Sequence, residues 1–282
     1  MRLFRYISLF FLVFGTWKAL ALSVTQIITN YTEFCQSAAN NEELFRRFRS
    51  EEPCKTIVEN VNFIQGSDIL HVIQEKYPHL FVYFDKICLD DRFGNPLTYN
   101  FPGVGAICPA TLRYVKIAGD LSQEFGNLSA YHILEIGGGY GGQCKILHDI
   151  FGFTSYTLVD LPGCTSLIMK YLCHYQIPGV SCIPSTKIMN AKNYDLVISN
   201  YAFSEIDREE QRDYLEKMIK SVPRGYITYN ILSSSHGLTS LTVDEVVTAL
   251  QRENRKIMVT PENPLTGEGT VVISWFPQES IY

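Results

Sequence analysis

A glycine-rich segment in the middle of the chain has the residue types best suited to hold a cofactor. Residues 131–136 are apolar and β-favouring, with Glu135 among them, and a cluster of glycines follows. Glycine permits positive φ and lets a ligand approach the backbone closely. Residues 143–151 then resume the apolar spacing of a helix. The segment therefore predicts a strand, a turn and a helix, an arrangement that suits a nucleoside cofactor.

Two cofactor classes fit this turn. Gly137-x-Gly139-x-x-Gly142 satisfies the dinucleotide pattern, in which amides at a helix N-terminus hold a pyrophosphate. Glu135-x-Gly137-x-Gly139-x-Gly141 resembles motif I of class I S-adenosylmethionine-dependent methyltransferases, where the acid lies near the methionine ammonium. A carboxylate here would repel a pyrophosphate. The charge therefore favours the methyltransferase, and an NAD-dependent oxidoreductase stays the alternative.

A second apolar strand strengthens the case for a nucleoside. It spans residues 156–160 and ends in Asp160. An acid at this point can accept both ribose hydroxyls, and NAD enzymes use the same device, so it does not separate the two classes. The part of the chain after His132 is long enough for one methyltransferase domain but leaves little for a separate dehydrogenase substrate domain.

Composition sets wider limits. With 282 residues, 46% hydrophobic and 19% charged, the chain has the make-up of an ordinary packed globule. A net charge of −5 argues against a nucleic-acid partner, which calls for a basic surface. No Cys-x-x-Cys or Cys/His ligand spacing occurs, and no metal site is predicted. The eight cysteines suit an oxidising compartment, with their pairing left open.

The N-terminus has the pattern of a signal peptide. Arg2 and Arg5 precede an apolar run over residues 6–17, and Ala19-Leu-Ala21 supplies small residues for cleavage. We therefore predict a signal peptide over residues 1–22 and export or entry into the secretory pathway. If the segment is not cleaved, it would act as an anchor and supply the chain's membrane contact. If it is not a signal, a cytoplasmic protein is expected.

The order of predicted elements indicates two regions. Residues 23–128 read as mainly helical, and Pro109 opens a helix over residues 110–125. Residues 129–282 alternate strands and helices as a doubly wound sheet requires. The last two strands are joined by a segment too short for a helical crossover, so they should pair antiparallel. The further strands are expected at 179–184, 194–200, 225–232, 256–260 and 270–276, and the further helices at 164–175, 207–221 and 242–253.

A narrower resemblance is to a family of sugar O-methyltransferases, over residues 93–277. The segments that carry it are Gly94-Asn-Pro, Pro109-Ala-Thr-Leu-Arg-Tyr114, Glu135-Ile-Gly-Gly-Gly-Tyr-Gly-Gly-Gln143, Asp195-Leu-Val-Ile-Ser-Asn-Tyr-Ala-Phe-Ser-Glu205 and Pro264-Leu-Thr266. The resemblance implies an α/β, Rossmann-like seven-stranded class I methyltransferase sheet with a mainly helical N-terminal extension. It also implies S-adenosylmethionine as the cofactor and a sugar or glycan hydroxyl as the acceptor.

The resemblance assigns cofactor contacts by position. Asp160 would accept the ribose hydroxyls and Leu161 would pack on the adenine. Asn200 would face the crevice at the carboxyl end of its strand, unless it is a cap or turn residue. Arg113 or Tyr114 would close over the cofactor, or Tyr114 would pack in the interface. The residues expected around the methionine portion are Glu135, Gly137, Gly139 and Gly141.

The implied chemistry is an in-line displacement at a methyl group on a positively charged sulfur. Holding the nucleophile in line supplies most of the rate, about 7–11 kcal/mol, and a general base adds roughly 10²–10⁴-fold. The candidate bases are Glu205 and His236. Glu205 could instead hold the next helix N-terminus, and His236 could be only a loop residue. A non-catalytic, secreted methyltransferase-like binding domain is the further alternative.

Overall fold

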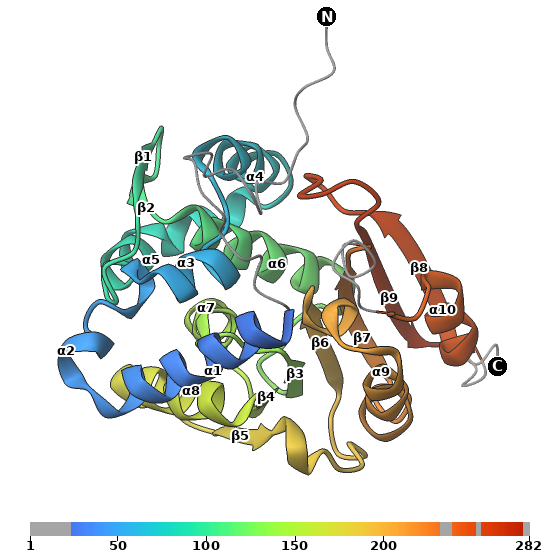
Figure 1. Cartoon of the computed structure of the whole chain (residues 1–282). Coiled ribbons are helices and arrows are strands. Elements are labelled where there is room, and N and C mark those ends of the chain that lie inside the picture. Colours follow the sequence, from blue (N-terminus) through green and yellow to red (C-terminus); the bar gives the residue numbers. More distant parts are fainter. Residues whose placement is uncertain (1–23, 232–238, 252–254, 279–282) are drawn as a thin grey trace, which may run out of the picture.

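A seven-stranded sheet forms the centre of the computed structural model, which describes residues 24–231, 239–251 and 255–278 (Figure 1). The strand order is β5-β4-β3-β6-β7-β9-β8. All neighbouring strands pair parallel except β9, which is antiparallel to both β7 and β8. The bounds are β3 His132–Ile136, β4 Ser155–Asp160, β5 Val180–Pro184, β6 Leu196–Asn200, β7 Arg224–Tyr229, β8 Arg255–Pro261 and β9 Val271–Pro277. The predicted sheet and its reversed final hairpin are confirmed.

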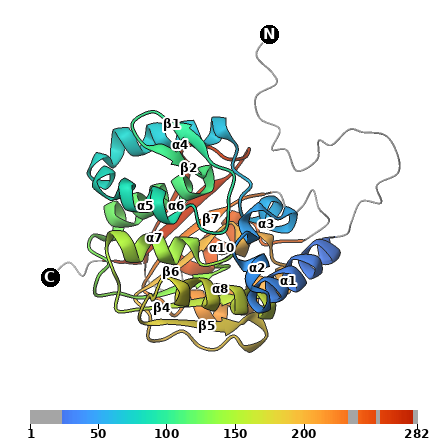
Figure 2. The ribbon, with the colours of Figure 1, turned by 90° about the vertical axis from the view of Figure 1, so that its left-hand side faces the viewer.

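Helices cover both faces of the sheet, and for this reason the central strands are apolar on both sides. Ile133 and Tyr156 pack on one face, against α6 (Pro109–Phe125), α7 (Gly142–Ile150) and α8 (Pro162–His174). Figure 2 shows these three helices in front of the strands. The residues on the opposite face pack against α9 (Arg208–Tyr214), the π-helical turn Leu215–Ile219 and α10 (Val243–Gln251).

The N-terminal region is mainly helical, as predicted, and it forms a layer on the same face of the sheet as α7 and α8. Its first helix, α1, lies along α8, and α4 packs on α6 (Figures 1 and 2). A short hairpin, which the sequence did not predict, interrupts the helices. The elements are α1 Val24–Asn40, α2 Glu42–Phe45, α3 Glu52–Ile57, α4 Phe63–Lys76, α5 Phe84–Asp90, β1 Tyr99–Phe101 and β2 Gly105–Ile107.

Local sequence signals account for several element ends. α6 begins at Pro109 and is closed by Gly126 with φ of 74°. At the start of α10, Thr242 and Glu245 exchange backbone and side-chain hydrogen bonds in a capping box. The crossover from β5 to β6 contains only the single turn Ser185–Lys187, since the chain there is too short for a helix.

The predictions about the signal segment and the cysteines are tested only where the structure describes the chain. The predicted signal segment, residues 1–22, lies outside the described residues. Among the helices that the structure describes, none combines the length and apolar character needed to cross a bilayer. All eight cysteines are free thiols, and five of them are buried.

Candidate cofactor site

The turn after β3 has a backbone that requires glycine. Gly137, Gly139 and Gly141 have φ of 81°, 60° and 96°, in the left-handed region that disfavours other residues. A Cβ atom on Gly137 would also lie 2.0 Å from the Cβ atom of Ala202, which follows β6. The predicted glycines are therefore needed both for the turn and for the close approach of the segment after β6.

The Asp160 carboxylate holds the glycine turn. Asp160 ends β4, and its Oδ2 atom accepts a hydrogen bond of 3.0 Å from the Gly139 amide while Oδ1 accepts one of 2.7 Å from the Leu161 amide. Burial raises the pKa of Asp160 to about 6, although these amides act to lower it. An ionised carboxylate accepts about four hydrogen bonds. Hydrogen bonds from the Cys164 thiol and the Gly138 amide also act to lower this pKa. A ribose would therefore share the Asp160 carboxylate with these donors.

Glu135 lies beneath the same turn, in the middle of the sheet. Its residue is 2% exposed, and its carboxylate accepts a 3.0 Å hydrogen bond from the Tyr156 hydroxyl. Burial raises the pKa of Glu135 to about 8, the Tyr156 hydrogen bond opposes this shift, and the nearby Asp160 charge adds to it. The Glu135 carboxyl is therefore mainly protonated at neutral pH until a cation approaches it.

Asn200, at the carboxyl end of β6, has an unsatisfied donor. Its Oδ1 atom accepts a 3.2 Å hydrogen bond from the Thr228 hydroxyl. Its buried Nδ2 atom has no hydrogen-bond partner in the described part of the chain. A buried donor without a partner costs roughly 1–3 kcal/mol, so Asn200 suits a position where a ligand supplies the acceptor.

A second unsatisfied group approaches Asp160 from the N-terminal layer. Tyr31 of α1 is 6% exposed, and its hydroxyl has no hydrogen-bond partner among the described residues. Burial raises the pKa of Tyr31, and the nearby groups of Cys35, Cys164 and Asp160 add to the shift. The sequence did not point to Tyr31, because its proximity to Asp160 depends on how α1 packs on α8.

Tyr201 joins two of the segments that carry the family resemblance. It follows Asn200 and has φ of 68° and ψ of −40°, a strained backbone for a residue with a side chain. Its hydroxyl donates a hydrogen bond to Glu262 and lies 3.3 Å from the Thr266 hydroxyl. The Arg113 guanidinium lies 5.3 Å from the centre of its ring. Of these residues, sequence reasoning considered only Arg113 as a site residue.

Of the two candidate bases, only Glu205 lies within the described residues. Glu205 lies in the single turn Ala202–Glu205 after β6, is exposed, and accepts a 2.7 Å hydrogen bond from Asn230 at the end of β7. Asp207 caps α9 by accepting from the Glu209 amide, so the capping role considered for Glu205 falls to Asp207. Glu205 therefore stays a candidate at the edge where β6 and β7 end. His236 lies outside the described residues.

Tyr114 and its neighbour Arg113 lie in different surroundings. The Tyr114 ring is 9% exposed, and a Cβ atom on Gly142 would lie 2.5 Å from it, so it packs between α6 and α7. The Arg113 guanidinium lies 6.0 Å from the centre of the Tyr114 ring and also faces Tyr201. Leu161, expected at the adenine, is half-buried against the core at the start of α8. The cofactor roles of Tyr114 and Leu161 stay predictions.

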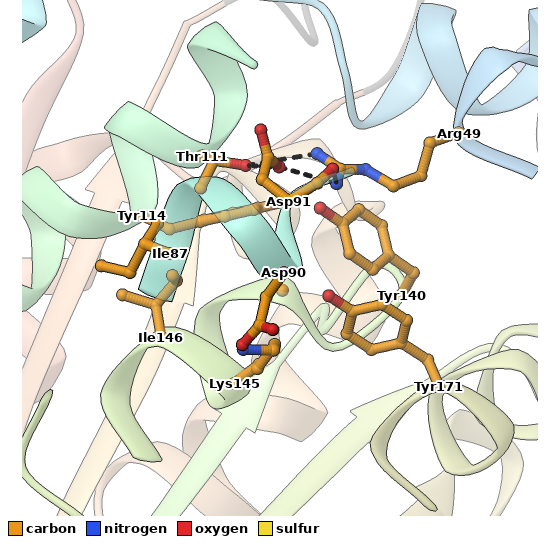
Figure 3. Close-up of a pocket in the computed structure, with 11 residues that line it drawn as sticks. Arg49, Ile87, Asp90, Asp91, Thr111, Tyr114, Tyr140, Lys145, Ile146 and Tyr171 are labelled. Carbon is orange, nitrogen blue, oxygen red and sulfur yellow. Dashed lines mark hydrogen bonds and ion pairs between the residues drawn. The ribbon is translucent and has the colours of Figure 1, made fainter. Parts of the chain in front are cut away.

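A buried charged cluster supports the turn from below (Figure 3). Arg49 is 1% exposed and pairs with Glu59 and with Asp91, whose carboxylate also accepts from the Thr111 hydroxyl. The Arg49 guanidinium lies 5.1 Å from the ring of Tyr140, a residue of the glycine turn. Removing one partner of such a buried pair typically costs about 3–5 kcal/mol. The cluster therefore fixes the N-terminal layer against the turn.

A small cavity of about 10 Å³ adjoins this cluster. Figure 3 shows the Tyr140 and Tyr171 side chains extending toward Asp91 at its edge. Its volume is about that of a single water molecule, so it is not the crevice for a nucleoside. The described residues also contain no group of three His, Cys, Asp or Glu side chains that could hold a metal ion.

Comparisons with known proteins find similarity to solved structures alone. No family model matches the sequence, and no curated protein sequence matches it. The chain is similar to an S-adenosylmethionine-dependent methyltransferase from Mesorhizobium loti, with 13% identity and a TM-score of 0.45 over 55% of this chain and 95% of that one.

Two further solved structures are similar at the same level. A magnesium protoporphyrin IX methyltransferase from Synechocystis, solved with S-adenosylhomocysteine, has 12% identity and a TM-score of 0.47, over 60% of this chain and 83% of that one. A geranyl diphosphate C-methyltransferase from Streptomyces coelicolor has 12% identity and a TM-score of 0.47, over 58% and 79%. At these values the functional argument rests on the chain's own geometry.

Proposed function

We propose that this chain is an S-adenosylmethionine-dependent O-methyltransferase that acts on a sugar or glycan hydroxyl. The observation that carries the cofactor part is the Asp160 carboxylate bonded to the Gly139 amide at the carboxyl end of the central strands. Open α/β sheets bind their ligands at this edge. The acceptor part is supported only by the sequence resemblance to sugar O-methyltransferases.

Two features favour this cofactor over a dinucleotide. A pyrophosphate site needs free amides and little negative charge, but the Gly139 amide is already bonded to Asp160, whose carboxylate would also repel a pyrophosphate. The doubly wound dinucleotide-binding sheet is mostly parallel, with strand order 3-2-1-4-5-6. Here β9 enters between β7 and β8 with the opposite direction.

The residues at the turn fit the chemical groups of S-adenosylmethionine. Asp160 offers an acceptor to the ribose hydroxyls, which would share it with the Gly139 and Leu161 amides, and Glu135 would ionise beside an ammonium. The Asn200 side-chain amide and the Tyr31 hydroxyl are buried without partners among the described residues. A bound nucleoside has polar atoms that could form hydrogen bonds with both groups. When bound, the cofactor supplies a methyl group on a positively charged sulfur.

The protein's part in the transfer is positioning and proton removal. The glycine turn and the ends of β3 and β6 hold the reacting groups in line, which is the larger effect. A Glu205 carboxylate oxygen accepts the proton of the acceptor hydroxyl, oriented by the hydrogen bond from Asn230. Glu205→Gln is expected to lower methyl transfer to glycan extracts by roughly 10²–10⁴-fold. The variant should still bind S-adenosylhomocysteine as the natural protein does. Glu209→Gln is the control and should change neither binding nor transfer. If Glu205→Gln transfers methyl groups at the natural rate, Glu205 is not the base.

Ligand-induced thermal stabilisation tests the cofactor proposal. S-Adenosylhomocysteine at 100 times its dissociation constant should stabilise the protein by about 2.7 kcal/mol, which raises Tm by roughly 5–10 °C for a chain of this size. NAD should give no shift. A shift with NAD alone would select the oxidoreductase. If a well-folded protein is stabilised by neither ligand, the non-catalytic binding domain becomes the favoured alternative.

A further inference from the structure

We propose that Arg113 binds the α-carboxylate of the cofactor's amino-acid portion, an inference that rests on the proposed function. S-Adenosylmethionine and S-adenosylhomocysteine end in an ammonium and a carboxylate. Asp160 suits the ribose, and Glu135 would ionise beside the ammonium, but neither carboxylate would attract the ligand carboxylate. A cation close to the glycine turn would complete the site.

Arg113 is held by two segments that face the glycine turn. Its guanidinium donates a 3.0 Å hydrogen bond to the Val58 carbonyl oxygen and stacks 5.3 Å from the Tyr201 ring. A Cβ atom on Gly139 would lie 3.4 Å from Val58 Cγ1, so Val58 faces that glycine. The residue after Tyr201 is Ala202, which faces Gly137. The two groups that hold Arg113 therefore belong to the segments that face the two glycines.

The charge of Arg113 has no direct counter-ion in the described structure. Its two hydrogen bonds go to uncharged oxygens, the Val58 carbonyl and the Asn60 side-chain amide, the latter at 3.2 Å. None of the ion pairs found within the described ranges includes it. A guanidinium has five N–H donors and bonds carboxylates in a two-pronged geometry. Arg113 therefore keeps donors for a ligand carboxylate.

The surroundings keep this guanidinium charged and in place. Burial acts to lower the pKa of Arg113, but Tyr201, Tyr114 and the carboxylates of Glu262 and Glu59 outweigh it and the pKa is raised. Tyr201 is fixed in turn by its hydrogen bond to Glu262. A charged donor already fixed in its bound orientation loses little freedom when a ligand arrives. The strained backbone of Tyr201 is consistent with this positioning task.

Two ligands that differ only in the amino-acid portion test this role. S-Adenosylhomocysteine carries the carboxylate, and 5′-methylthioadenosine keeps the adenosine and sulfur but lacks it. We expect Arg113→Met to weaken S-adenosylhomocysteine binding about tenfold or more in calorimetry and to leave 5′-methylthioadenosine binding unchanged. Arg113→Lys should recover part of the lost affinity, because lysine restores the positive charge but cannot bond a carboxylate through two parallel N–H groups.

The control variant is Arg46→Met, because Arg46 has a side chain 73% exposed and pairs only across its own short helix with Glu42. It should bind both ligands like the natural protein. If Arg113→Met weakens both ligands equally, or weakens neither, Arg113 has no carboxylate role. If the natural protein binds neither ligand, the proposed function itself fails, and this result is distinct from the other two.

Discussion

Burial of Glu135 links the stability of the protein to pH. Its pKa rises from an ordinary 4.5 to about 8 in the folded protein. Below pH 4.5 the carboxyl is protonated in both the folded and unfolded states. Between these values only the unfolded state loses its proton, so the free energy of unfolding falls as pH rises toward about 8 and then levels off. Asp160, with a pKa of about 6, adds a similar decrease at lower pH.

Glu135→Gln removes this titration and keeps an oxygen for the Tyr156 hydroxyl. Between pH 6.5 and 8.5, where Asp160 is already ionised, the unliganded natural protein should lose roughly 2 kcal/mol more stability than the variant. Urea unfolding at the two pH values measures the difference. Glu43→Gln, at an exposed residue of α2, should keep the natural slope. Equal slopes for Glu135→Gln and the natural protein would contradict the buried, protonated carboxyl.

At the residue scale, the sequence predicted the part of the site whose chemistry is local. Gly137, Gly139 and Asp160 lie at strand ends that can be read from apolar runs, and the structure brings them together through the Gly139 amide. Arg113 and Tyr201 meet because α6 crosses the end of β6. Contacts of this kind depend on the tertiary arrangement, so the spacing of residues along the chain does not predict them.

At the scale of elements, the buried parallel strands were the most predictable. β3, β4 and β6 are apolar runs covered on both faces, so their sequences define them closely. The π-helical turn Leu215–Ile219 replaces the end of the helix predicted over residues 207–221. β1 and β2 have three residues each, too few for any alternation to show. Short elements are defined by their neighbours.

The N-terminal layer shows the same dependence on neighbours. Arg49 is one of three arginines in a short basic run, which by itself suggests a solvated helix face. In the structure its guanidinium is buried, because Glu59 and Asp91 arrive from segments far apart in the chain. The Arg49 amide also donates a hydrogen bond to the Gly94 carbonyl oxygen. The charge pattern alone could not predict this burial.

At the scale of the whole molecule, the two regions share one hydrophobic core. A single cluster of buried side chains runs from Tyr31 of α1 through α6, α7 and α8 to the sheet residues Ile133 and Tyr156. The Thr32 carbonyl oxygen approaches α8 so closely that a Cβ atom on Gly163 would lie 2.2 Å from it. The N-terminal layer is therefore the cover of one face of the sheet and not an appended unit.

This shared core predicts that residues 129–282 will not fold alone. Without α1 and α6 the fragment would expose the apolar faces of α7 and α8, and each large apolar side chain left uncovered costs roughly 1.5–3 kcal/mol, so a few exceed the usual stability margin. We expect the fragment to lack a cooperative thermal transition by circular dichroism and to bind no S-adenosylhomocysteine, while a chain of residues 24–282 shows the transition. A fragment that unfolds cooperatively would instead establish the sheet and its own helices as an independent domain.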